Sequence, residues 1–154
     1  MDRWVLMAYR LPREPSTPRI ALWRKLRQLG VAQLLDSLVA LPLDSRNREQ
    51  MGWLADEVVE AGGEASIWVA EPASLAQERE LITTLSDAIA AEYKAVLGQA
   101  QTAASGDDTT RRRALTRLRR ELRRIGERDY YPPPERKQAR EAVERLGKTA
   151  EVTE

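Results

Sequence analysis

The segment Thr109–Arg128 (TTRRRALTRLRRELRRIGER) constrains the fold most strongly, because its pattern is helical although nearly half of it is arginine. Its apolar residues recur at spacings of three and four, which places them on one narrow stripe of a helix: Leu115, Leu118, Leu122 and Ile125. Nine arginines surround that stripe, against two glutamates. We expect the segment to dock on a protein core through the stripe and to carry dense positive charge elsewhere.

Two interpretations of these arginines remain open on the sequence. Arginine binds phosphate and other oxyanions through paired N–H donors, which favours nucleic acid or an oxyanion as the partner. Alternatively, the arginines pair with acids of a neighbouring helix or of an acidic partner protein, because charge runs are common on solvated faces. We predict DNA contacts for six arginines that lie off the apolar stripe: Arg111, Arg112, Arg113, Arg119, Arg120 and Arg123. Arg117 and Arg124 border the stripe and are expected to form internal ion pairs.

Charge is segregated along the chain although the net charge is +1. Residues 1–30 and 109–154 are basic and residues 31–108 are acidic. In the basic N-terminal part, Arg10, Arg13 and Arg19 flank the start of a predicted helix, where backbone N–H groups attract anions. We predict an anion-binding site there, the alternative being a merely exposed loop.

The first 72 residues predict a ferredoxin-like unit. Strand-like runs at Trp4–Tyr9 and Glu64–Glu71 enclose two helices and two short strands, the latter within Val31–Leu43 and hinged at Asp36-Ser37. The helices begin at Ser16–Pro18 and Asp44-Ser45 and end at Gly30 and Gly62-Gly63. This β-α-β-β-α-β order predicts an α+β fold with a four-stranded antiparallel sheet.

Helices alone are predicted after residue 72. A long helix starts at a Ser74–Gln77 capping box and runs to about Ala104, and the arginine helix follows. After a proline corner at Asp129–Pro134, a last helix spans Glu135–Leu146 and is expected to end at Gly147. We expect domains at 1–72 and 73–148 and a flexible tail at 149–154.

Composition excludes several functions. The chain has no cysteine and no histidine, which removes thiol chemistry, the usual general base and the common transition-metal ligands. It has no Gly-rich phosphate-binding motif, no apolar run of membrane-spanning length and no signal-peptide pattern. We expect a cytoplasmic protein that is not an enzyme and holds neither metal nor cofactor. Its tryptophans, Trp4, Trp23, Trp53 and Trp68, are expected in the core, with base stacking as the alternative.

Several segments together resemble the chromate-resistance regulator family ChrB. These are WVLMAYRLPREPSTPRIALWRKLRQLG at the start, GGEASIWVAE after the second helix, and the arginine helix running into DYYPPPERKQAREAVERL. The resemblance implies a DNA-binding transcriptional regulator that responds to chromate. Family members commonly continue into a second, sensor-like domain, for which 154 residues leave no room, so we expect DNA binding more than chromate sensing.

The ferredoxin-like part also resembles the C-terminal domain of the PaaX repressor and the small CRISPR-adaptation nuclease. That nuclease holds a divalent metal with an aspartate at the end of its first strand, where this chain has Tyr9-Arg10-Leu11. A metal-dependent nuclease is therefore not expected. We expect a homodimer, because regulators often bind paired half-sites and the apolar segment Ala40–Leu43 suits an open sheet edge.

Overall fold

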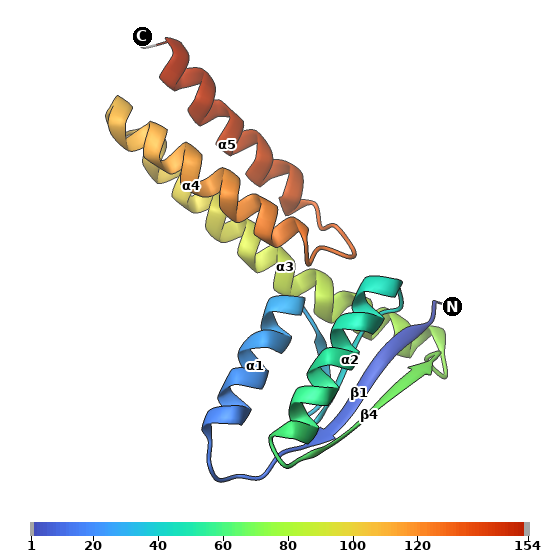
Figure 1. The fold of residues 1–154 in the computed structure, drawn as a ribbon. Helices are drawn as coiled ribbons and strands as arrows, with labels where there is room; N and C mark the ends of the chain where they lie inside the picture. Colours follow the sequence, from blue (N-terminus) through green and yellow to red (C-terminus); the bar gives the residue numbers. More distant parts are fainter. Residues whose placement is uncertain (1, 153–154) are drawn as a thin grey trace. The chain divides into compact units, whose positions relative to one another are not determined.

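Strand β1 (Trp4–Arg10) lies inside a four-stranded sheet and pairs on both sides. The computed structural model describes residues 2–152, the last four by their backbone alone. The other strands are β2 (Ala32–Leu35), β3 (Leu38–Pro42) and β4 (Glu64–Ala70), in the order β2-β3-β1-β4 with every pairing antiparallel. This is the predicted ferredoxin-like arrangement in an α+β fold (Figure 1).

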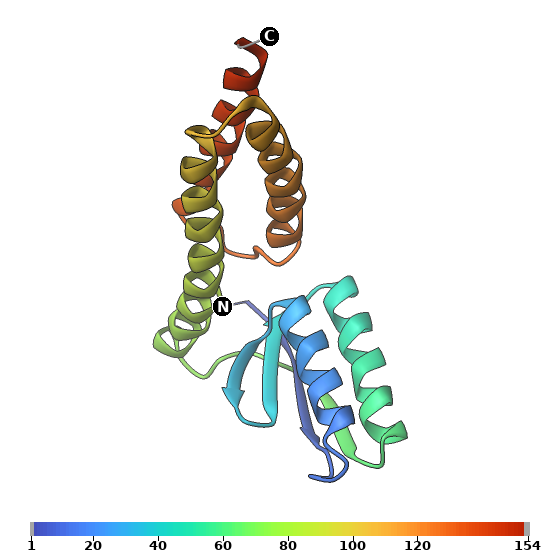
Figure 2. The same ribbon diagram turned by 90° about the vertical axis from the view of Figure 1, so that its left-hand side faces the viewer.

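One face of the sheet is covered by α1 (Thr17–Leu29) and α2 (Ser45–Glu60), which lie side by side on it (Figures 1 and 2). Val5 and Met7 point to this face and are wholly buried, as are their β3 partners Leu41 and Val39. Val5 and Met7 are therefore apolar because they meet helices, whereas Leu6 and Ala8, which alternate with them, are only partly buried.

The capping signals of α2 act as predicted. The Asp44 carboxylate accepts a hydrogen bond from the Asn47 backbone N–H at 2.6 Å, and Asn47 Nδ2 donates to the Pro42 carbonyl oxygen at 2.9 Å. The helix is followed by Gly62 at φ 90°, a left-handed conformation that favours glycine. The chain can then reverse into β4.

The predicted open edge at Ala40–Leu43 is wrong. Residues 40–42 belong to β3, which pairs with β1 on one side and with β2 on the other. Leu41 is apolar because it is buried between the sheet and its helices. The edges of the sheet are β2 and β4.

Three helices form the rest of the chain: α3 (Leu75–Ala104), α4 (Asp108–Gly126) and α5 (Glu135–Val152). Their core is a cluster of buried residues from all three helices, including Tyr93 of α3, Leu118 and Ile125 of α4 and Leu146 of α5. The chain divides into two compact units, one ending at Thr83 and the next beginning at Thr84. The first turns of α3 thus group with the sheet, where the Asp2 N–H donates to Glu78 Oε2 at 2.9 Å.

Gly147 does not end the last helix as predicted, because α5 continues to Val152. Gly147 is buried, and a Cβ there would lie 3.4 Å from Leu115 Cδ2 of α4. The position therefore faces α4 within the helix, at a distance where a Cβ would make an ordinary van der Waals contact. Residues 149–152 of the expected tail are helical, and residues 153–154 lie outside the described residues. Within the described part of the chain, no helix is both long and apolar enough to cross a bilayer.

Candidate nucleic-acid interface and anion pocket

Helix α4 is stabilised at both ends by charges of favourable sign. At its start, the Asp107 carboxylate accepts a hydrogen bond from the Thr110 backbone N–H at 2.8 Å, and the pKa of Asp107 is lowered, chiefly by this contact. Asp108 lies in the first turn and Arg123 and Arg124 in the last. Acids near the N-terminus and cations near the C-terminus complement the helix dipole.

The predicted apolar stripe does face the core. Leu118 and Ile125 are fully buried, and Leu115 and Leu122 pack partly buried against the same cluster. Ala114 is buried beside them. The face opposite this stripe is left to the arginines.

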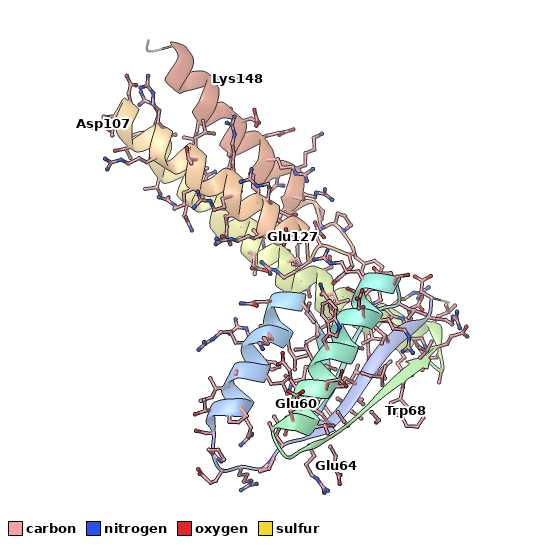
Figure 3. The ribbon with its side chains drawn as sticks, viewed as in Figure 1. Glu60, Glu64, Trp68, Asp107, Glu127 and Lys148 are labelled. Carbon is pink, nitrogen blue, oxygen red and sulfur yellow. The ribbon has the colours of Figure 1, made fainter. Side chains whose placement is uncertain are left out.

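Most arginines of α4 are exposed, and their nitrogens spread along the helix between Asp107 and Glu127 (Figure 3). Within residues 2–148, whose side chains are described, Arg113, Arg117, Arg120 and Arg123 form no salt bridge. Arg112 is exposed as well. We call this set, Arg112, Arg113, Arg117, Arg120 and Arg123, the α4 arginine face.

Other arginines are engaged inside the helical unit. Arg119, which was predicted to contact DNA, lies 3.9 Å from Glu144 of α5. Arg124 lies 3.8 Å from Glu121 on its own helix, as expected for internal pairing. Arg128, after the helix, donates to Glu92 of α3 at 2.5 Å. Arg117 instead lines a groove between α3 and α4 and makes no ion pair among the described side chains.

The prediction that Arg111 contacts DNA is wrong, because its guanidinium is buried at the start of the helix. It donates to the Gly106 carbonyl oxygen and to the Asp108 carboxylate, and only 9% of the residue is exposed. The spacing contained this signal: Arg111 precedes Leu115 by four residues and Leu118 by seven, which continues the buried stripe.

The corner between α4 and α5 is held by a buried carboxylate. Tyr93 Oη of α3 donates to Asp129 Oδ2 at 2.8 Å, and Arg136 of α5 lies 3.8 Å from the same oxygen. Burial, together with the hydrogen bond to Asp129 and its charge, raises the pKa of Tyr93 to about 12. This contact thus ties α3 and α5 to the corner that follows α4.

In the first unit, the structure brings the three predicted anion-binding arginines around one hollow. Arg10, Arg13 and Arg19 line a pocket of about 690 Å³ between the β1–α1 loop, α1 and the β2–β3 turn. Arg10 is also paired with Glu64 of β4, its Nη2 lying 2.9 Å from the carboxylate. Arg13 and Arg19 form no ion pair within the described residues.

Polar groups also line this pocket. Tyr9 Oη and Gln33 Nε2 both donate to the Asp36 carbonyl oxygen, at 3.3 and 3.4 Å. The pKa of Tyr9 is raised, mainly by burial and further by the Asp36 charge, while Arg19 opposes the shift. Ser16 is the N-cap of α1, but its hydroxyl makes no capping hydrogen bond.

The prediction that the tryptophans lie in the core is right only for Trp4, which is 1% exposed. Trp23 on α1 and Trp53 on α2 are 39% and 59% exposed. Trp68 is 60% exposed and projects from β4, on the sheet face opposite the helices (Figure 3). Nearby apolar residues in the sequence could not reveal this, because burial depends on which elements cover each face.

A model of the family described as "Protein ChrB, N-terminal" matches residues 19–105. This chain belongs to the ChrB N-terminal family. The match spans α1 to the end of α3, so Arg19 lies inside it, whereas Arg10, Arg13 and α4 of this ChrB-family chain lie outside. No curated protein matched the chain, and no solved structure matched it.

Proposed function

We propose that this ChrB-family chain is a DNA-binding transcriptional regulator of chromate-resistance genes that contacts DNA phosphates through the α4 arginine face. The observation that carries the proposal is a row of exposed arginines, four of which have no salt bridge among the described side chains. An arginine guanidinium on an exposed helix matches the geometry of a phosphate oxygen pair.

Repulsion within the helix supports a polyanionic partner. Arg113 and Arg117, Arg119 and Arg123, and Arg120 and Arg124 are like-charge pairs at a separation of four residues. Each such pair destabilises an isolated helix by about 0.2–0.5 kcal/mol. A bound phosphate backbone would relieve this repulsion, and the release of condensed counterions from DNA adds a further driving force.

The composition of α4 favours backbone contacts over base reading. It contains neither asparagine nor glutamine, the side chains that pair with adenine in the major groove. Arginine with guanine is therefore the only bidentate base contact of the common kind that this helix offers. We infer that affinity comes mostly from phosphates and is only weakly dependent on sequence.

The proposed role is binding without catalysis, in the cytoplasm, and without a bound cofactor. The absence of histidine and cysteine from the chain supports the part of this proposal that concerns catalysis. Chromate as the effector stays a prediction that follows from the family resemblance.

We also propose that the chain forms a homodimer through strand β4. The other edge strand, β2, has four residues and a register shift between Gln33 and Leu35, which discourages further pairing. Strand β4 has seven residues and carries the exposed Trp68 and Val69. A dimer would double the number of phosphate contacts at paired half-sites.

The test is fluorescence anisotropy with DNA from upstream of the protein's own gene and with random DNA of equal length. Between roughly 50 and 200 mM salt, log affinity should fall linearly with log salt, by about 0.9 for each phosphate neutralised. Polyglutamate is the competitor that represents an acidic protein partner. No binding to either DNA at the lowest salt, or displacement by polyglutamate at equal charge, would favour a protein-interaction module instead.

A further inference from the structure

We propose that the pocket between the β1–α1 loop, α1 and the β2–β3 turn binds a nucleoside monophosphate or a closely similar phosphorylated, flat ligand. This site lies within the first unit and is separate from the α4 arginine face. The inference goes beyond DNA binding and does not rest on it.

The pocket has room for a ligand larger than a bare oxyanion. Its volume of about 690 Å³ lies within the usual range for sites that take drug-sized molecules, about 300–1,000 Å³. A water molecule takes up about 30 Å³ of liquid, and a tetrahedral oxyanion is only a few times larger. A single inorganic ion would therefore leave most of the lining untouched.

The cationic side of the pocket suits a phosphate group. Arg13 and Arg19 are exposed, line the hollow and form no ion pair within the described residues. Arginine binds a terminal phosphate through two parallel N–H donors, a geometry that lysine lacks. These two side chains are the expected phosphate ligands.

Other lining groups suit the ring of a nucleotide. Trp23 is partly exposed and lines the same hollow, so its indole face can stack on a base. Asp36 and Gln33 also line it and offer acceptors and donors for a base edge. A carboxylate in a pocket for a bare dianion would weaken binding, whereas it favours a ligand with N–H donors at one end.

The pocket's polar groups are already ordered without a ligand. Tyr9 and Gln33 both donate to the Asp36 carbonyl oxygen, so β1, β2 and the β2–β3 turn are connected. A ligand entering the hollow therefore meets groups that need little reorganisation, which favours affinity.

Isothermal titration calorimetry of the full chain with AMP, adenosine, inorganic phosphate and chromate tests this proposal. AMP should bind saturably, and adenosine, phosphate and chromate should each bind at least about tenfold more weakly, because each lacks one half of the recognised groups. The double variant Arg13→Gln/Arg19→Gln should weaken AMP binding by about tenfold or more. Trp23→Leu should weaken AMP but leave phosphate binding unchanged.

Two control variants keep the result specific. Arg24→Gln/Arg27→Gln removes the same charge from exposed positions of α1 outside the pocket lining and should leave AMP affinity within about twofold. Arg113→Gln/Arg120→Gln/Arg123→Gln, on α4, should also leave it unchanged. No saturable AMP binding up to about 1 mM would overturn the proposal. So would phosphate or chromate binding as tightly as AMP, or an equal drop in affinity in either control variant.

Discussion

At the scale of single residues, Tyr93 and Asp129 form a buried, hydrogen-bonded pair in the helical unit. The tyrosine is 1% exposed, and its hydroxyl donates to a carboxylate whose side chain is itself 1% exposed. A buried carboxylate is costly unless hydrogen bonds and a cation compensate it. Here Tyr93 donates a hydrogen bond to Oδ2 and the Arg136 cation lies 3.8 Å from the same oxygen, whereas Oδ1 is buried without a hydrogen-bond partner among the described residues. The corner between α4 and α5 therefore depends strongly on the Tyr93 contact.

Replacing Tyr93 by phenylalanine should therefore destabilise the protein at neutral pH by about 1–3 kcal/mol, because Asp129 loses a donor in a buried site. The pH dependence has a definite sign. The folded-state pKa of Tyr93 is about 12, above its usual value of 10, so the folded state retains a proton that the unfolded state has released. The stabilisation that the protonated Tyr93 hydroxyl provides is fully present below pH 10. It is lost as the pH rises through 12.

Urea unfolding at several pH values between 8 and 12 checks this prediction. The stability difference between the parent protein and Tyr93→Phe should shrink across the upper part of that range. A difference that stays constant up to pH 12 would show that the tyrosine proton is not retained in the folded state.

At the scale of elements, α4 combines a buried stripe with an arginine face, and its exposed arginines are not equivalent. Arg119 and Arg124 have acidic neighbours, whereas Arg113, Arg120 and Arg123 form no salt bridge within the described side chains. The last three are therefore the sharper probes of DNA binding. All three lie off the buried stripe.

Arg113→Gln/Arg120→Gln/Arg123→Gln should leave the fold intact and weaken binding to operator and random DNA alike. The log–log salt slope should flatten by about 0.9 for each phosphate that the variant no longer neutralises. The matched control is Lys94→Gln/Lys137→Gln/Lys148→Gln, which removes the same charge from exposed positions of the same unit outside α4. Anisotropy titrations in which both triple variants bind DNA equally weakly would mean that only net charge matters.

At the scale of the whole molecule, the proposed homodimer depends on a sheet edge that local patterns did not identify. The apolar segment Ala40–Leu43 suggested an edge, but β3 is internal and β4 is the longer of the two edge strands. Strand β4 exposes Trp68, whose indole Nε1 donates to Ser66 of the same strand, at 2.8 Å.

Light scattering should give twice the 17.5 kDa chain mass at micromolar concentrations. Trp68→Lys should shift the protein to a monomer, because a charged lysine on an edge strand opposes pairing between chains. The exposed Trp53→Lys is the control, since it lies on α2, and should leave the mass unchanged. A monomer mass for the parent protein up to millimolar concentration would contradict the dimer.

The sequence by itself determined the elements and their order, because strand and helix patterns, caps and turns are local. The apolar run of β1, the hinge at Asp36-Ser37, the Asp44 cap and the stripe of α4 all have their causes within a few residues. The β-α-β-β-α-β order also predicted a ferredoxin-like antiparallel sheet, but not which strands form its edges.

Only the tertiary structure decided which surfaces of those elements are covered. Gly147 lies inside a helix, and Trp23, Trp53 and Trp68 face outward. These outcomes depend on elements distant in sequence: α5 brings Gly147 against α4, and the two helices of the sheet cover the face opposite Trp68. The tertiary structure also places Arg13, Arg19 and Asp36 around one pocket. Local periodicity carries no information on such neighbours, because burial is a property of packed pairs of elements.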